Sequence, residues 1–431
     1  MWNNSNSLTM MNNTQNNSRR HFLKTLSLGT AGLFVSTPST RAHAVAQSPL
    51  LQEKIEEALY AFVIADAMGG SVENNLPEQT LAQFGNWDFN NFLPTTKKSD
   101  IEKKQGKGDG RTTDDTLNLE ALIGCYLRHQ DHLDANDYAE FYIKEITGKK
   151  VWIAEKGEMM TPFERPLWQP ERYVYQRLVI NNIEPRYAGM GNWINEGFQG
   201  IMMPVGAVNA GDAFGAYDEA TSIAMAHTES YGVECAGMNA AAFAEAFRKN
   251  STINSILETA LRVAKDGVRL SLQDVIAAID TNDSFEQFSA KTREAVLPYL
   301  QLSPALLKQK NIETPKMLRE GTNIGRPSRI ATIENVPIAL AALKYGNGDY
   351  FKTLKAGIFY GRDAETIAAV ATSLLCAMKG KDVIPKKLKS EVDAVNRRNY
   401  AALAKEFFET VRAIYQKDIK RLEERKLIIE Q

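Results

Sequence analysis

Apolar residues recur three or four positions apart along most of this 431-residue chain, and this spacing constrains the fold more than any other feature. It places the apolar side chains on one face of a helix. The alternation of apolar and polar residues that marks a half-buried strand is nearly absent. We therefore expect an all-α fold, with helices at about 51–66, 113–128, 215–228, 237–248, 253–265, 272–280, 336–344, 365–378 and 391–425.

The charge balance argues against one class of partner. The chain has 51 Lys and Arg and 52 Asp and Glu residues, a formal net charge of −1, and the two signs are interspersed. Such a surface offers no general electrostatic attraction to nucleic acid or to an anionic membrane. We therefore expect no nucleic-acid partner.

The three cysteines, Cys125, Cys235 and Cys376, lie far apart in apolar or small-residue surroundings, and no CxxC motif is present. Free cysteine is among the most often buried residue types. The spacing fits neither a disulfide framework nor a metal site. We expect three buried thiols that act as small hydrophobic side chains.

The first 46 residues have the order of an export leader. Arg19 and Arg20, within Ser-Arg-Arg-His-Phe-Leu-Lys, resemble the twin-arginine signature of bacteria. An apolar stretch over 26–35 and a small-x-small cleavage motif at 42–44 follow. The apolar stretch is too short for a permanent membrane anchor. We expect a mature protein that works in the periplasm or outside the cell, although a basic N-terminus ahead of a short helix is the alternative.

After the leader, we expect one catalytic domain over 47–390 and an amphipathic helical extension over 391–431. The stretch of about 80–111 is polar and rich in Gly and Lys, which predicts a long loop leading into a helix. Long loops within compact domains are often functional. In the extension, apolar residues recur on a charged background, which predicts a helix that packs on the domain or on a partner.

Acidic residues open two of the expected helices: residues 112–116 read TTDDT, and residues 361–366 read GRDAET. Each has a local explanation, because Thr112 with Asp115 fits a loose capping box and Asp363 can cap a helix. If the two helix starts converge, however, they supply the carboxylate and hydroxyl oxygens that Mg²⁺ and Mn²⁺ prefer. The five histidines form no zinc motif of the HExxH kind.

The order of the motifs resembles that of the ADP-ribosylglycohydrolase family over about residues 51–390. TDDT alone is a weak motif, whereas several blocks in one order are specific. Two departures stand out: Glu365 occupies a position where the family usually has Asp, and residues 200–203 replace a small-and-Arg pattern. The blocks that carry the resemblance are Ala61–Glu73, Thr113–Thr116, Met203–Gly206 with His227 after it, Glu334–Leu340, Gly361–Thr366 and Ile384–Pro385.

The resemblance implies a compact, single-domain helical fold with two Mg²⁺ or Mn²⁺ ions at converging helix N-termini. Asp114 or Asp115 would orient or deprotonate the attacking water, and Glu73 would lie near the scissile bond, unless it is a solvated loop acid. The aromatic residues Trp152, Trp168, Tyr187, Trp193 and Phe198 would stack an adenine or pack in the core. The implied metal ligands are Thr113, Asp114, Asp115, Asp363, Glu365 and Thr366.

The implied reaction is hydrolysis of the glycosidic bond at the ribose anomeric carbon of an ADP-ribosyl substrate, either a small molecule or protein-linked. Two alternatives stay open. One is a hydrolase of another ribosyl or nucleotide-sugar compound, and the other is a binding or immunity protein that keeps the fold without catalysis. The intact acids of both motifs disfavour the second alternative.

Overall fold

The computed structural model of the chain describes residues 50–165, 169–192, 198–299 and 332–430. The expected leader, with Arg19 and Arg20, lies outside these ranges. Helices dominate, as predicted: α2 (Leu51–Gly69), α3 (Pro77–Phe84), α4 (Lys98–Lys103), α5 (Asp114–His129), α6 (Ala135–Gly148), α7 (Gln169–Tyr175), α8 (Met203–Val208), α9 (Ala213–Ala224), α10 (Tyr231–Ala246), α11 (Ile253–Val263), α12 (Asp266–Ala278), α13 (Phe285–Val296), α16 (Thr332–Gly346), α17 (Tyr350–Tyr360), α18 (Ala364–Lys379), α19 (Lys386–Asn396) and α20 (Tyr400–Ile429).

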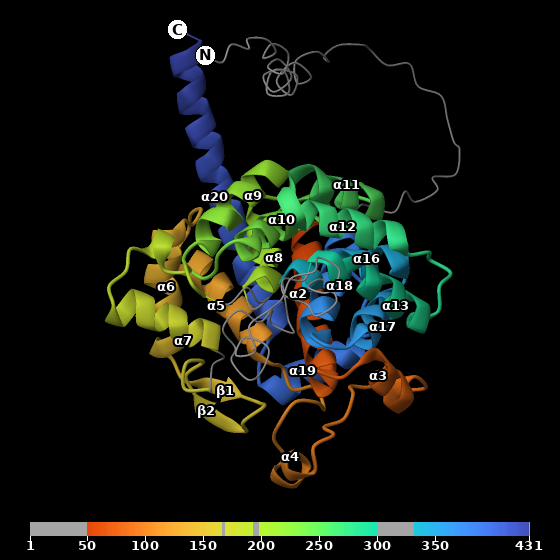
Figure 1. Cartoon of the computed structure of the whole chain (residues 1–431). Helices are drawn as coiled ribbons and strands as arrows, with labels where there is room; N and C mark the ends of the chain where they lie inside the picture. The colour runs from red at the N-terminus through yellow and green to blue at the C-terminus, as the bar shows by residue number, and fades with distance from the viewer. Residues whose placement is uncertain (1–49, 166–168, 193–197, 300–331, 431) are drawn as a thin grey trace, which may run out of the picture. The chain divides into compact units, whose positions relative to one another are not determined.

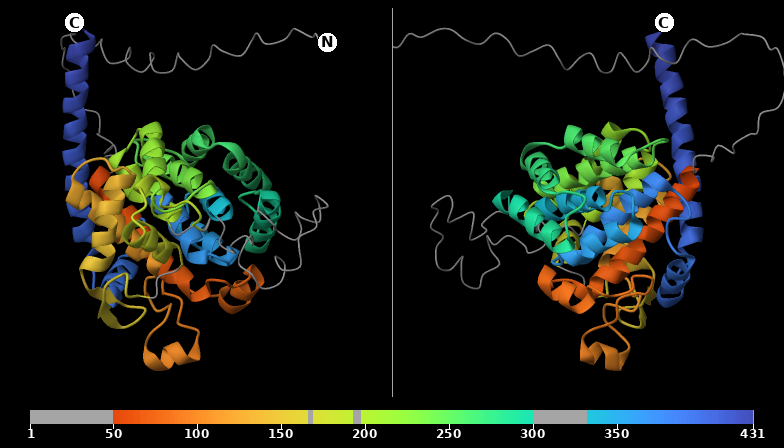
Figure 2. Two further views of the ribbon diagram at one scale, coloured as in Figure 1. Left: turned by 60° about the vertical axis from the view of Figure 1, so that its left-hand side comes forward. Right: turned by 90° about the vertical axis from the view of Figure 1, so that its right-hand side faces the viewer.

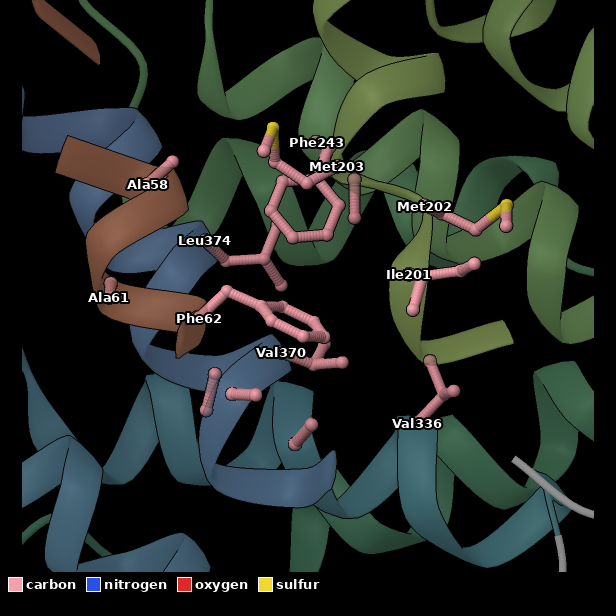
Figure 3. Packing of buried hydrophobic residues seen from close by; sticks show 14 of the residues in the cluster. Ala58, Ala61, Phe62, Ile201, Met202, Met203, Phe243, Val336, Val370 and Leu374 are labelled. Atoms are coloured by element: carbon pink, nitrogen blue, oxygen red, sulfur yellow. The ribbon is translucent and has the colours of Figure 1, made fainter. Parts of the chain in front are cut away.

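Helix α2 lies along α18 in the centre of the core. Both helices are buried over most of their length, as expected for helices that are apolar on nearly all sides. Phe62 of α2 packs among Val370 and Leu374 of α18 and Phe243 of α10 (Figure 3). The two backbones come closest at Gly69, where a Cβ atom would lie 2.3 Å from the Cα of Glu365. Only glycine permits this approach, which brings the end of α2 against the start of α18.

Further helices surround this pair (Figure 1). Helices α16 and α17 contact α18, α10 contacts α8, α9 and α11, and α5 packs on α6. Two short antiparallel strands, β1 (Val151–Ile153) and β2 (Glu158–Met160), form a hairpin in which Trp152 pairs with Met159. The segment expected as a long loop over 80–111 contains the end of α3 and all of α4. Ser48–Gln431 forms one compact unit.

The C-terminal segment forms two helices where the sequence predicted one. Arg397 adopts a φ of 51°, in the left-handed region, and so ends α19. Asn399 then caps α20 by accepting a 2.9 Å hydrogen bond from the backbone of Ala402. Phe407 and Ile414 are buried in the same core as α2. Residues 420–430 are exposed, and this end of α20 extends away from the other helices (Figure 2).

The cysteines behave as predicted. Cys125, Cys235 and Cys376 are buried, and burial raises the pKa of each thiol well above its usual value. Across the described ranges, no helix is both long enough and apolar enough to cross a membrane.

Candidate active site

The first turns of α5 and α18 contact each other, and the first turn of α5 also contacts Asp66 near the end of α2. The hydroxyl of Thr366 donates a 2.5 Å hydrogen bond to Oδ2 of Asp115. Asp66 of α2, fully buried, accepts three hydrogen bonds: 2.5 Å from the Thr113 hydroxyl, 2.9 Å from the Thr113 backbone and 2.5 Å from the Thr116 hydroxyl. These bonds satisfy a buried carboxylate and hold the TDDT turn in one position.

Local capping accounts for only part of this arrangement. The cap of α5 is Thr113, whose hydroxyl accepts from the backbone of Asp115 at 3.3 Å. Thr112 instead donates a 3.0 Å hydrogen bond to Asn396, so the capping box suggested by the sequence does not form. Asp363 occupies the N-cap position of α18, but its side chain makes no capping bond. Its Oδ2 accepts a 2.7 Å hydrogen bond from Asn335 of α16.

Arg165 neutralises one side of the cluster. Its guanidinium Nη2 lies 3.0 Å from Oδ1 of Asp114 and 2.6 Å from Oε2 of Glu155. Burial acts to raise the pKa of Asp114, but the charges of Arg165 and Lys107 outweigh it and hold the pKa below its usual value. Asp114 therefore stays ionised at neutral pH.

Lys107 neutralises the other side. Its ammonium forms an ion pair with Glu73, and its Nζ lies 3.3 Å from Oε1 of Glu365. Burial raises the pKa of Glu365, and Lys107 opposes that shift. The structure thus brings Glu73 and Glu365 together, as part of one cluster, through a residue that the sequence did not single out.

Among the described residues, no basic side chain forms an ion pair with Asp66 or Asp115. Burial raises the pKa of Asp115 well above its usual value, and the nearby charges of Asp66, Asp114 and Glu365 raise it further. Burial likewise raises the pKa of Asp66, to about 6. Two adjacent residues of one turn, Asp114 and Asp115, therefore have pKa values pushed in opposite directions.

The expected metal ligands are already paired with protein groups. Among the residues that the structure describes, no three His, Cys, Asp or Glu side chains are grouped so that they could hold a metal ion. Asp114 pairs with Arg165, Glu365 with Lys107, and Asp363 accepts from an amide. All six predicted ligands nevertheless lie at the two helix starts joined by the bond between Thr366 and Asp115.

A second buried polar group lies beside the acids. Asn118, one turn after Asp114, donates to Glu171 at 3.3 Å and accepts a 2.8 Å hydrogen bond from Tyr142. Nε2 of His227 lies 3.8 Å from the same oxygen of Glu171. The remaining atoms, Oε2 of Glu171 and Nδ1 of His227, are buried without a hydrogen-bond partner in the described part of the chain.

The expected aromatic platform is not confirmed. Phe198 is buried and stacks on His227, with ring centroids 4.9 Å apart, so it is a core residue. Trp152 donates to a backbone oxygen of α19, and the guanidinium of Arg397 lies 3.6 Å from its ring centroid. Tyr187 is exposed. Trp168 and Trp193 lie outside the described residues.

Three site residues were absent from the sequence prediction: Asp66, Lys107 and Arg165. A signal existed for Asp66, because a carboxylate inside the apolar run of residues 61–68 must find partners when that helix is buried. Lys107 and Arg165 belong to no pattern, and only the folded chain brings them to the acids.

Comparison with known proteins places the chain in a family. Residues 47–417 match the family model described as ADP-ribosylglycohydrolase. The "Uncharacterized protein YegU" of Escherichia coli (strain K12) is 23% identical over 363 residues, covering 82% of this chain and 97% of that protein. A solved structure described as an "ADP-ribosylglycohydrolase-related protein complex" shares the fold, with a TM-score of 0.54 at 17% identity over 84% of this chain and 99% of its own. Since the family model spans most of the sequence, the chain belongs to the ADP-ribosylglycohydrolase family.

Proposed function

We propose that the protein is a divalent-cation-dependent hydrolase that cleaves the glycosidic bond at the ribose anomeric carbon of an ADP-ribosyl substrate. Family membership supports glycohydrolase chemistry in general. The observation that carries the specific proposal is the junction of the two acidic helix starts at Asp115 and Thr366. If the two helix starts lay on separate faces, local capping would explain their acidic residues. Carboxylates that converge are instead a feature of functional sites.

The chemistry of the donor set fits a hard cation such as Mg²⁺ or Mn²⁺. Every predicted ligand offers oxygen, the donor that these ions prefer. Within the described part of the chain, the cluster holds more acids than bases. Lys107 and Arg165 pair with its acids, whereas neither base pairs with the buried Asp66 or Asp115. Oε2 of Glu365 is also buried with no partner in the described residues. Uncompensated buried carboxylates of this kind favour a bound cation.

The residues that would hold the cation are Thr113, Asp114, Asp115, Asp363, Glu365 and Thr366. When bound, it would supply a Lewis acid for the ribose hydroxyls and for water. Because Asp114, Glu365 and Asp363 are each paired with a side chain of the protein, binding would require these pairs to lengthen or exchange.

We assign the proton transfer to Asp115. Its Oδ2 accepts the hydrogen bond of the Thr366 hydroxyl, and its Oδ1 would accept a proton from the attacking water. The burial that raises its pKa also favours its protonated form after transfer. Asp115 would therefore take the proton of the water as the water's bond to the anomeric carbon forms and the glycosidic bond breaks, and that proton would then pass to the departing group.

Asp114 has a different role in this proposal. Arg165 keeps it ionised, so it can stabilise the positive charge that develops on the sugar in an oxocarbenium-like transition state. Glu73 lies in the same cluster but pairs with Lys107. We therefore place Glu73 near the scissile bond as an orienting group rather than as the base.

A substrate screen tests this proposal. Chelator-treated full-length protein, resupplied with Mn²⁺, is incubated with ADP-ribosyl arginine, ADP-ribosyl serine and O-acetyl-ADP-ribose, and the products are identified by mass spectrometry. We expect the wild type to release ADP-ribose from at least one of them and Asp115→Asn to release it about 10²–10⁴-fold more slowly. Release from a different ribosyl compound would identify another hydrolase, and tight binding without release would identify a binding protein.

We also propose that the enzyme is exported. The support is the leader sequence alone, with its paired arginines followed by an apolar stretch and a cleavage motif. The twin-arginine route carries folded proteins, which suits an enzyme that acquires a cation before export.

A further inference from the structure

Lys107 is a cation built into the acid cluster. Its Nζ pairs with Glu73 and lies 3.3 Å from Oε1 of Glu365, and its side chain is only 21% exposed. Lysine is rarely buried unless it is paired. Here two carboxylates from separate parts of the chain, one after α2 and one in the first turn of α18, share the same ammonium.

The loop that carries Lys107 is fixed on both sides. Gly106 donates to the backbone oxygen of Glu155 at 2.7 Å, and Asp109 donates to that of Leu93 at 2.8 Å. Gly108 has a φ of 111°, and a Cβ atom there would lie 2.5 Å from the backbone nitrogen of Thr95, so this turn requires glycine. The stem of Lys107 is therefore held in place and is not a mobile surface side chain.

The stem of Lys107 also packs closely against the backbone at Gly70. A Cβ atom on Gly70 would lie 2.9 Å from Cγ2 of Thr113 and 3.4 Å from Cβ of Lys107. The stem thus packs over Gly70, beside the residue that caps α5. The carboxylates of Glu365, Asp114 and Glu155 keep the ammonium charged against the cost of burial.

We propose that Lys107 occupies one of the two cation positions of this site, so that the protein binds a single divalent ion. This inference rests on the proposed function, because it concerns how many ions the same acids hold. An ammonium that pairs with Glu365 neutralises a carboxylate that a second ion would use, and it would repel that ion at contact distance. Among the described residues, no lysine pairs with Asp115, and the basic residue on that side, Arg165, pairs with Asp114 instead. We therefore place the single ion beside Asp115.

The test counts ions in the full-length protein. Chelator-treated samples are titrated with Mn²⁺ by isothermal titration calorimetry, and the bound metal is counted by elemental analysis after desalting. We expect one Mn²⁺ per chain for the wild type and two for Lys107→Met, which keeps the apolar stem without the charge. Lys107→Arg keeps the charge and should still bind one.

Lys156→Met is the matched control. Lys156 lies 3.4 Å from Glu155 and so also neutralises an acid at this site, but it does not pair with Glu73 or Glu365. This variant should bind one ion. If Lys107→Met does not fold, the double variant Glu73→Gln, Lys107→Met removes one charge of each sign, and a gain of a second ion is still expected.

Two Mn²⁺ ions in the wild type, no ion in any variant, or no gain on removing the charge of Lys107 would each overturn the inference. Its failure is distinguishable from that of the proposed function. A wild type that binds two ions and releases ADP-ribose contradicts only the role of Lys107. A count that rises from one to two without cleavage of any substrate supports the role of Lys107 and contradicts the proposed reaction.

Discussion

The hydroxyl of Thr366 donates a 2.5 Å hydrogen bond to the carboxylate of Asp115, a residue 251 positions earlier in the chain. Each residue lies in the first turn of its own helix, and capping would use bonds within that turn. A bond between the two turns has no local explanation. It is the contact that makes one site from two acidic motifs.

Asp115→Asn should stabilise the protein when no cation is present. Burial and three neighbouring acids raise the pKa of Asp115, so its charge lowers stability at neutral pH, and an amide removes that repulsion. The variant should melt at a higher temperature than the wild type in chelator and gain less from Mn²⁺. Turnover should fall by about 10²–10⁴-fold, the usual contribution of a general base. Asp382→Asn, at an exposed position, should change none of these quantities.

The close approach of α2 and α18 gives a second prediction. In Gly69→Ala the new Cβ atom would meet the Cα of Glu365 at 2.3 Å and must push the helices apart. We expect a loss of about 1–3 kcal/mol in the free energy of unfolding, the usual cost of overpacking, together with reduced activity. Gly148→Ala is the control, because a Cβ atom there meets nothing within 4 Å. Equal stability of the two variants in chemical denaturation would contradict the packing described for Gly69.

His132 should make stability depend on pH. Its ring nitrogens lie 2.6 Å from Glu219 of α9 and 3.0 Å from Asp418 of α20. Burial opposes the charged form, but these hydrogen bonds and charges raise the pKa of His132 from 6.5 to about 9. The stabilisation is therefore complete below pH 6.5 and is lost as the pH rises to about 9.

The measurement is the melting temperature across this pH range. Between pH 6.5 and 9, the melting temperature of the wild type should fall by a few degrees more than that of His132→Gln. His129→Gln is the control, because the nearest acid, Asp137, lies 3.7 Å from its ring. Parallel curves for the wild type and His132→Gln would show that this contact does not hold α20.

The sequence predicted several of the most buried helices, but it missed α17, which is buried over most of its length. Helices α2, α5, α10 and α18 carry broad apolar faces, so their spacing was clear. Helix α13 was missed because its buried stripe is narrow and partly polar, with Thr292 between Phe288 and Val296. Helix α6 likewise buries few residues, two of them tyrosines. Arg397 ends α19 through a left-handed backbone conformation, which the presence of an arginine does not predict.

The site could be predicted only in part, for a similar reason. Its acids form recognisable motifs, whereas their basic partners are single residues in loops. Arg165 and Lys107 reach the cluster through the packing of the β1–β2 region and the segment after α4. Phe198 carried the expected aromatic ring, but its position in the core follows from packing against Tyr138 and His227, which no local pattern indicates.

The leader gives a prediction that is independent of the folded domain. Changing Arg19 and Arg20 to Lys should retain the precursor in the cytoplasm, because the arginine pair is the element read by the export receptor. Changing Lys24 to Arg is the control and should leave export intact. Cell fractionation measures the outcome, and export of the double variant at the wild-type level would remove the support for a twin-arginine signal.

The most direct test of the proposed cation-dependent hydrolysis is whether the release of ADP-ribose depends on a divalent cation. Chelator-treated wild-type protein is titrated with Mn²⁺ while release from the best substrate of the screen is followed, with Asp115→Asn as the blank. If the proposal holds, we expect no release in chelator, restoration that saturates as Mn²⁺ binds, and release about 10²–10⁴-fold slower in the variant. Release at an unchanged rate in chelator, or equal release by Asp115→Asn, would contradict it.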